Sequence, residues 1–444
     1  MSPLQGLDLD LTGTVGFAPR LLNDDPSGLK PLSWRLWPYT LSPVLQPNGF
    51  FIVRKYFPHI TKPILILGLV SLFTDIASEM LYPVAPLFLK SLGASTVLIG
   101  ALEGFVEFIS GLLKGYFGAL SDRKGSRAGF VRAGYALSAL AKPLPGIWTT
   151  VGGVVTGRIT DRLGKGMRSA PRDALLASYG GKKSQGAVFG FHRAMDTLGA
   201  ALGPLLALGF LVLYPNAFRE LYLLAFIPSI LAVIATFFVS EVPFTPKSDT
   251  KPFAPFAVFS YWSASPAAYK RIVIGLTLFA FVNSSDVFLI LKAGKVGFST
   301  AAAIGGYVFY NLVYALAAYP LGVLADSFGK RRVLVSGLVL YAVVYAGFAL
   351  LTQSWHAWVL FAFYGLYAAA TEGIAKAWMA DLVPNEDRGK AIGLQTMLAS
   401  FGTLVASLVA GILWDYISPN APFWLAAVGA IAAIPLLKKS VPPA

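Results

Sequence analysis

Charged side chains stand inside apolar stretches of this sequence, and their spacing would suit proton transfer or anion binding. The region 158–173 is the most charged of these stretches, and at helical spacing its bases fall on one face. That face contains Arg158, Arg162, Lys165 and Arg172. A row of positive charge in an apolar setting predicts a site that attracts anions or takes part in a proton relay.

Carboxylates in the neighbouring apolar stretches could neutralise this basic face. Asp75 and Glu79 are separated by one helical turn. Glu103 and Glu107 repeat that spacing in the next stretch, and Asp196 lies within a later one. An ionised group at the centre of a bilayer costs on the order of 3 kcal/mol unless it is paired or hydrated. These residues predict a proton relay or an anion-binding cavity, and the alternative is an ion-pair network that only orders the first half.

The second half of the chain carries fewer charges in its apolar stretches. Asp286 follows three polar residues, and Glu372 and Lys376 are separated by one helical turn. We expect these residues, with the acids and arginines of the first half, to line a substrate or proton pathway. Aromatic residues could contact a substrate there, although each is more typical of packing. They are Tyr82, Tyr307, Tyr310, Tyr314, Tyr364, Tyr367 and Trp378.

The elements that position these residues must be membrane helices. Hydrophobic residues make up 56% of the 444 positions and charged residues only 13%. Apolar runs of about 20 residues recur, long enough to cross a hydrocarbon core of about 30 Å as helices. The chain has no cysteine, which excludes disulfides, thiolate metal sites and cysteine nucleophiles. Its three histidines are too scattered to predict a metal centre, and no cofactor is expected.

Twelve membrane-spanning helices are predicted, in two bundles of six. Residues 1–62 are interrupted by prolines and are expected to be a disordered cytoplasmic extension. Residues 63–240 and 272–438 are the two bundles, and the proline-rich segment 241–271 is the cytoplasmic linker. The expected spans are 64–89, 96–118, 130–147, 149–178, 187–213, 220–240, 272–292, 300–323, 333–351, 356–380, 390–413 and 421–437.

The charge distribution predicts the orientation in the membrane. The formal net charge is +14, and the basic residues concentrate in every second loop, which the positive-inside rule assigns to the cytoplasm. Both termini are then cytoplasmic, and the inner membrane of a bacterium is the expected location. Because membrane topology explains the basic residues, no nucleic-acid partner is expected.

A short motif occurs once in each half of the chain, beginning at Gly118 and again at Gly322. The first copy contains Gly118, Asp122, Arg123, Gly125 and Arg127. The second copy contains Gly322, Asp326, Gly329 and Lys330. In this setting an aspartate can cap a neighbouring helix and pair with arginine, which predicts a cytoplasmic latch that breaks when the halves move. The alternative is a basic loop that only sets topology.

A second pattern of small residues is also repeated. In the first half it consists of Gly190, Gly199, Gly203 and Pro204. Displaced by 203 positions, the second half has Gly393, Gly402, Ala406 and Ser407. Glycines allow close backbone contact and proline bends a helix, which suits a helix that seals one face of a cavity. Ordinary tight helix packing is the alternative.

Residues 63–438 resemble the major facilitator superfamily. The motif at Gly118 is similar to the family's loop between helices two and three, and the copy at Gly322 is similar to its loop between helices eight and nine. The pattern from Gly190 to Pro204 resembles the helix-five motif of antiporter-type exporters, although Ala207 and Leu208 replace its usual later glycines. The resemblance implies an all-α membrane fold of twelve helices in two pseudo-symmetric bundles. It also implies a cavity lined by spans one, four, seven and ten.

The sequence therefore predicts a secondary active transporter that works by alternating access, with proton-coupled efflux of a small organic solute as the leading hypothesis. Its expected partners are the solute, protons and membrane lipid, and it is expected to be a monomer. An alternative is uptake or exchange of an organic anion bound by Arg158 and Arg162. A membrane receptor or a membrane-embedded enzyme is a further class, for which the sequence offers no nucleophile and base, metal cluster or phosphate loop.

Overall fold

The computed structural model describes residues 57–181, 183–246, 257–298 and 300–438. Most of the predicted extension 1–62 and part of the predicted linker lie outside these ranges. Every regular element within them is a helix. The described chain is therefore all-α, as the sequence predicts.

The first half contains six predicted spans, three of them divided into two helices. Pro83 and Pro143 stand at two of these divisions, where proline cannot donate the backbone hydrogen bond that would continue the preceding helix. The helices are α2 (Lys62–Leu81), α3 (Val84–Ser91), α4 (Thr96–Lys124), α5 (Ala128–Ala141), α6 (Leu144–Ile147), α7 (Val151–Tyr179), α8 (Gln185–Leu213), α9 (Phe218–Leu224) and α10 (Phe226–Thr236).

The second half repeats this order after a short linker helix. Its first span is divided between α12 and α13, where residues 281–286 are not helical. The helices are α11 (Ala257–Ala264), α12 (Ala267–Ala280), α13 (Val287–Lys295), α14 (Thr300–Phe328), α15 (Lys330–Ala349), α16 (Ser354–Leu382), α17 (Arg388–Tyr416) and α18 (Ala421–Lys438), with a 3-10 turn at Asn385–Asp387 before α17.

The twelve predicted spans correspond to these helices within a few residues at each end. In the described part of the chain, seven spans are apolar and long enough to cross a bilayer by length and composition alone. Helices α4 and α7 have the length, at 29 residues each, but carry several charged residues. Most of those charges that the structure describes are buried or partly buried against other helices, whereas the side chain of Glu107 is 55% exposed.

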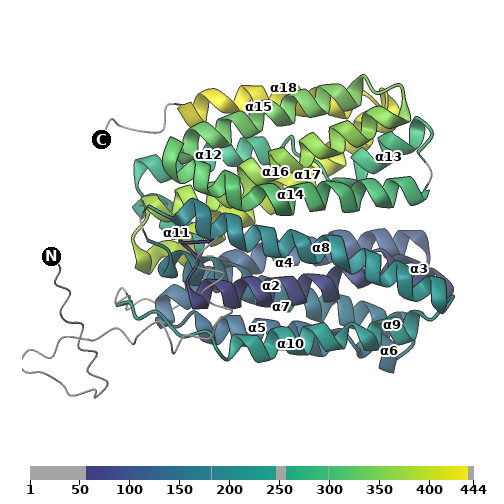
Figure 1. Cartoon of the computed structure of the whole chain (residues 1–444), viewed down its shortest axis with the longest axis horizontal. Coiled ribbons are helices and arrows are strands. Elements are labelled where there is room, and N and C mark those ends of the chain that lie inside the picture. Colours follow the sequence, from purple (N-terminus) through teal and green to yellow (C-terminus); the bar gives the residue numbers. More distant parts are fainter. Residues whose placement is uncertain (1–56, 182, 247–256, 299, 439–444) are drawn as a thin grey trace, which may run out of the picture. The chain divides into compact units, whose positions relative to one another are not determined.

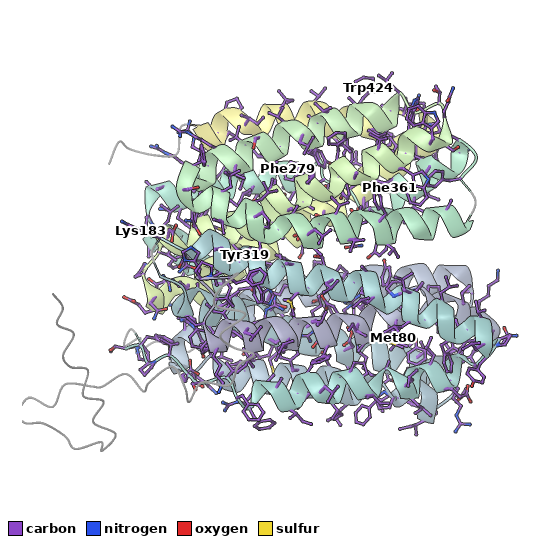
Figure 2. All side chains as sticks on the ribbon, viewed as in Figure 1. Met80, Lys183, Phe279, Tyr319, Phe361 and Trp424 are labelled. Carbon is purple, nitrogen blue, oxygen red and sulfur yellow. The ribbon has the colours of Figure 1, made fainter. Side chains whose placement is uncertain are left out.

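Two helix pairs make the most extensive contacts between the halves. Helix α8 packs along α14, and α4 packs along α17. Figure 1 shows the first half in purple to teal and the second in green to yellow, with α11 near one end of the helices and α3, α6, α9 and α13 near the other. We call these ends the α11 end and the opposite end. Met80 and Phe361 are buried inside the two halves, whereas Trp424 lies on an outer face (Figure 2).

The halves meet backbone to backbone at four glycines near the α11 end. A methyl group on Gly118 would lie 2.3 Å from the carbonyl oxygen of Gly389, and one on Gly186 would lie 2.3 Å from that of Gly322. No side chain fits at such distances, so glycine is required at these crossings. The two crossings are equivalent under the repeat, and at both of them the backbones of the two halves are in contact.

Candidate functional site

A cavity of about 370 Å³ lies between the two halves. Helices α2, α4, α7 and α8 line it from the first half, and α12, α15, α16 and α17 from the second. The predicted lining helices, spans one, four, seven and ten, are therefore joined by neighbours. The bases on its walls are Lys114, Lys165, Arg168, Arg172, Arg193 and Lys376. The acids are Asp75, Asp173, Asp196 and Glu372.

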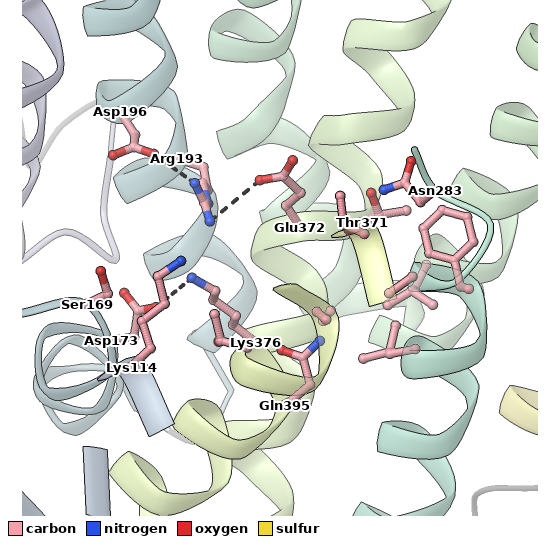
Figure 3. Close-up of a pocket in the computed structure, with 18 of the residues that line it drawn as sticks. Lys114, Ser169, Asp173, Arg193, Asp196, Asn283, Thr371, Glu372, Lys376 and Gln395 are labelled. Carbon is pink, nitrogen blue, oxygen red and sulfur yellow. Dashed lines mark hydrogen bonds and ion pairs between the residues drawn. The ribbon is translucent and has the colours of Figure 1, made fainter. Parts of the chain in front are cut away.

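Two ion pairs cross the cavity and connect the halves (Figure 3). The Nζ of Lys376 on α16 lies 2.5 Å from Oδ2 of Asp173 on α7. One guanidinium nitrogen of Arg193 on α8 lies 3.5 Å from Oε2 of Glu372 on α16. Asp173 also pairs with Arg172 at 2.9 Å. The predicted pathway residues Glu372 and Lys376 are thus at the interface of the halves.

A pair of carboxyl groups is the chemically most distinctive feature of the cavity. Asp75 on α2 and Asp196 on α8 both line the cavity, and their carboxyl groups are close enough to repel each other when both are ionised. Asp196 accepts hydrogen bonds from Ser71 at 2.5 Å and from Arg193 at 2.7 Å. Two carboxylates that face each other away from bulk water repel, and a proton on one of them removes this repulsion. Because Ser71 and Arg193 donate to Asp196 and favour its anionic form, Asp75 is the acid of the pair that is suited to take up a proton.

The helix-five pattern explains how this pair is brought together. A methyl group on Gly199 would lie 2.6 Å from the carbonyl oxygen of Leu72 and 2.9 Å from Cβ of Asp75. A methyl group on Gly203 would lie 2.9 Å from Cβ of Glu79. These two glycines let α8 approach α2 at the two turns that carry its carboxylates. The same glycines therefore provide the close packing of the two helices and position the acids.

Other predicted pathway residues lie outside the cavity lining. Glu79 accepts a hydrogen bond of 3.4 Å from Tyr307 on α14. Asp286 accepts hydrogen bonds from Tyr310 at 2.9 Å and Tyr364 at 2.6 Å. Asp286 is thus held by phenols within the second half.

The outer part of the basic face of α7 is separate from the cavity as well. A guanidinium nitrogen of Arg162 lies 3.9 Å from Oε2 of Glu107. The guanidinium of Arg158 lies 6.0 Å from the ring centre of Tyr82. The side chain of Glu103 lies outside what the structure describes. Along α7 it is Lys165, with Arg168 and Arg172 beyond it, that lines the cavity.

Lys114 and Arg193 were not among the site residues predicted from the sequence. Arg193 lies three residues before Asp196 within the helix-five pattern, and this spacing was an available signal. Lys114 is a single base in an apolar stretch, and only the packing of α4 against α7 brings it to the cavity. No sequence spacing relates it to Lys165.

The repeated motif forms two equivalent helix caps at the α11 end. Asp122 accepts a hydrogen bond of 2.8 Å from the backbone N–H of Lys390, at the start of α17. Asp326 accepts bonds of 2.9 and 2.7 Å from the backbone N–H groups of Gly186 and Ala187, at the start of α8. A carboxylate there satisfies free N–H groups and the positive end of the helix dipole. Each cap joins one half to the other.

The first copy is reinforced by a buried arginine. The guanidinium of Arg127 lies 2.8 Å from Asp122 and donates to Ser178 and to the side chain of Asn385 in the other half. It also lies 4.1 Å from the ring centre of Phe244. In the second copy Lys330 pairs with Asp326 and with Asp381, each at 2.8 Å.

Glycines shape the turns after both aspartates. Gly125 has φ +65° and Gly329 has φ +98°, in the left-handed region that favours glycine. Arg123 precedes the first of these turns and is partly exposed.

Two related helical halves that cross a bilayer and enclose a charged cavity define the class of secondary transporters. The chain matches the Major Facilitator Superfamily over residues 67–310 and 296–444, and it belongs to this family. It is therefore a multi-pass membrane transporter.

Similar proteins cover most of the chain. An uncharacterized MFS-type transporter of Methanocaldococcus jannaschii, MJ1317, is 34% identical over 378 residues, which are 84% of this chain and 93% of that protein. A multi-drug resistance efflux pump PmrA homolog of Lactococcus lactis is 22% identical, over 79% of this chain and 87% of that protein. The crystal structure of the human organic anion transporter MFSD10 (TETRAN) has a TM-score of 0.75 at 16% identity, covering 84% of this chain and 98% of that one. This last similarity concerns the fold alone.

Proposed function

We propose that this protein is a proton-coupled secondary transporter that expels a small organic solute by alternating access. The observation that carries the proposal is the pair of acids Asp75 and Asp196, which lie together on the wall of the cavity. A carboxyl group beside a second one at a cavity wall can take up a proton from water and release it again.

Loss of this proton changes the electrostatics of the interface between the halves. Two negative charges would then face each other on the cavity wall, and repulsion between them favours a rearrangement. Arg193 is already bonded to Asp196 and is drawn toward the second negative charge. Its longer ion pair, at 3.5 Å with Glu372 of the other half, is the one that breaks. Deprotonation of Asp75 thus loosens an ion pair that holds the halves together.

The caps at the α11 end supply the opposing force. Asp122 and Asp326 each bind the N-terminus of a helix in the other half. We assign to the two copies of the motif the role of a latch that keeps the cavity closed at this end until the interface loosens. The linker segment 241–271 then connects two bundles that move relative to each other.

Orientation and direction complete the proposal. The basic loops that hold Arg127 and Lys330 are at the α11 end, which we place at the cytoplasm together with both termini. Export is supported by the resemblance of the pattern from Gly190 to Pro204 to antiporter-type exporters. The efflux pump homolog among the relatives supports the same direction.

Everted membrane vesicles test this proposal. Three probes share one aromatic body and differ in charge. Naphthalene-2-sulfonate is an anion, naphthalene-2-sulfonamide is neutral and 2-naphthyltrimethylammonium is a cation. We expect wild-type vesicles energised with ATP to accumulate one of them, and a protonophore to abolish the accumulation. Asp75→Asn should remove the gradient-driven accumulation and spare exchange of labelled for unlabelled probe.

The control is Asp415→Asn, because Asp415 is an exposed carboxylate of α17 remote from the cavity lining. It should transport like the wild type. Gradient-driven accumulation that persists unchanged in Asp75→Asn overturns the proposal. Accumulation confined to right-side-out vesicles would replace export by uptake.

A further inference from the structure

The walls of the cavity carry an excess of positive charge. Six basic and four acidic side chains line it, and one of the acids, Asp75, is the proton-binding group of the proposed function. The remaining acids are engaged by particular bases. Asp173 binds Arg172 and Lys376, and Asp196 and Glu372 both bind Arg193.

Three bases remain without a carboxylate partner among the described residues. No carboxylate of those residues lies within 4.0 Å of the charged groups of Lys114, Lys165 or Arg168. Arg168 donates to Ser138 at 2.5 Å and lies 4.5 Å from the ring centre of Tyr135. Both of these partners are neutral.

Lys114 and Lys165 lie on adjacent helices of the same wall. A methyl group on Gly166 would lie 2.6 Å from Cβ of Leu113, so α4 and α7 touch at the positions next to the two lysines. Lys114 is buried, with 8% of its surface exposed, and Figure 3 draws no interaction on it. Glu107 attracts both lysines as well as Arg162, but neither lysine nitrogen lies within 4.0 Å of its carboxylate. Lys114 is buried and Lys165 is only partly exposed, so these two ammonium groups suit an anion between them.

The wall of the second half has a different character. Apart from Glu372 and Lys376, which are paired across the cavity, it contributes apolar side chains such as Phe279 and uncharged polar groups such as Thr371. Figure 3 shows this separation, with Lys114 and Asp173 on one side of the cavity and Thr371 and Asn283 on the other. Phe279 is fixed by edge contacts with the rings of Tyr341 and Tyr367. This wall suits an apolar or aromatic body.

We infer that the cavity binds a small organic anion, whose acid group lies between Lys114 and Lys165 and whose apolar body packs on Phe279. The inference names the substrate class of the transport site and rests on the proposed function for its movement across the membrane. The basic site thus lies further along α7 than Arg158 and Arg162, the arginines that the sequence favoured for an anion.

Binding to the purified full-length protein in detergent tests the inference without requiring transport. The three naphthalene probes have nearly the same body, so only their charge distinguishes them. We expect naphthalene-2-sulfonate to raise the melting temperature, and the sulfonamide and the ammonium probe to leave it unchanged. Inorganic sulfate should bind at least about tenfold more weakly than the sulfonate, because it lacks the apolar body.

Variants of the two lysines identify the binding group. Lys114→Gln and Lys165→Gln should each raise the Kd for naphthalene-2-sulfonate about tenfold or more, since each removes a charged hydrogen-bond donor. Lys114→Arg should retain most of the binding. Lys90→Gln, at an exposed position of α3, is the matched control and should bind like the wild type.

Several outcomes would overturn the inference. They are equal binding of the sulfonamide or the ammonium probe, failure of the sulfonate to bind, equal binding of sulfate, or an unchanged Kd in both lysine variants. The result with wild-type protein decides the charge class even where a variant does not fold. Lysine-dependent binding of a sulfonate that is never moved with protons would contradict the proposed function alone. Proton-driven transport of the ammonium probe would contradict this inference alone.

Discussion

Lys376 and Asp173 pair at 2.5 Å across the two halves, and they are 203 positions apart in the chain. The same offset relates Gly186 to Gly389. Gly186 crosses Gly322, and Gly389 crosses Gly118, at the α11 end. A residue that contacts its own counterpart in a two-fold repeat must lie near the axis that relates the repeats. This ion pair therefore marks the axis, and the cavity that it lines lies on that axis.

Removal of either partner of this pair should have unequal effects. Asp173→Asn leaves Lys376 and Arg172 facing each other without a negative charge, and should cost about 3 kcal/mol of stability. Lys376→Gln should cost less, because Asp173 keeps Arg172. Thermal unfolding in detergent measures both effects, and the double variant should be less destabilised than the sum of the single variants. Equal losses that simply add would contradict the pairing, and Asp415→Asn is the neutral control.

The helix-five glycines offer a matched pair of substitutions on one helix. Gly199→Ala would place a methyl group 2.6 Å from the carbonyl oxygen of Leu72, and should cost about 1–3 kcal/mol through overpacking. Gly209→Ala meets nothing within 4 Å, and should be neutral or should stabilise α8 by up to about 1 kcal/mol through helix propensity. Melting temperatures compare the two variants. If both behave alike, close approach of α2 and α8 is not what Gly199 provides.

Much of the fold could be predicted because each membrane span can be recognised from its own stretch of sequence. A run of apolar residues must become a helix in a bilayer, wherever it lies in the bundle. The acids Asp75 and Glu79 were recognisable for the same reason, since a charge in such a run is costly and conspicuous. The caps formed by Asp122 and Asp326 were foreseeable from their repeated setting.

The residues that line the cavity could not be predicted, because they depend on contacts between helices that are distant in the sequence. Arg158 and Lys165 share one face of α7, yet only Lys165 reaches the cavity. Asp286 resembled the other buried acids in sequence, but two tyrosines from other helices bind it. Helical periodicity gives the direction of a side chain around its own axis. It does not say which positions along the length of the helix lie beside the cavity between the two halves.

The two latch aspartates should differ in strength. Asp122 and Arg127 are fully buried, whereas the side chains of Asp326 and Lys330 are each 10% exposed. Asp122→Asn should weaken the cap on α17 by about 1–2 kcal/mol and raise the open population about tenfold. Asp326→Asn should have a smaller effect, because solvent screens its interactions.

Cysteine labelling measures that opening. The chain has no cysteine, so Thr396→Cys places a single thiol at the cavity. An impermeant maleimide applied at the α11 end should react with it about tenfold faster in the Asp122→Asn background. Labelling that is equally slow in the two latch variants and in the parent would show that neither cap holds the cavity closed.

Arg127 should not be replaceable by lysine, although Lys330 occupies the equivalent position in the second half. Its guanidinium bonds Asp122, Ser178 and Asn385 at once, and it stacks on Phe244. An ammonium group cannot reach this planar set of partners, so Arg127→Lys should lower stability by about 2 kcal/mol and speed labelling of the Thr396→Cys thiol from the α11 end. Arg332→Lys, at an exposed site with one backbone contact, should do neither. If Arg127→Lys labels and melts like the parent, the positive charge alone sustains the latch and the geometry of the guanidinium is dispensable.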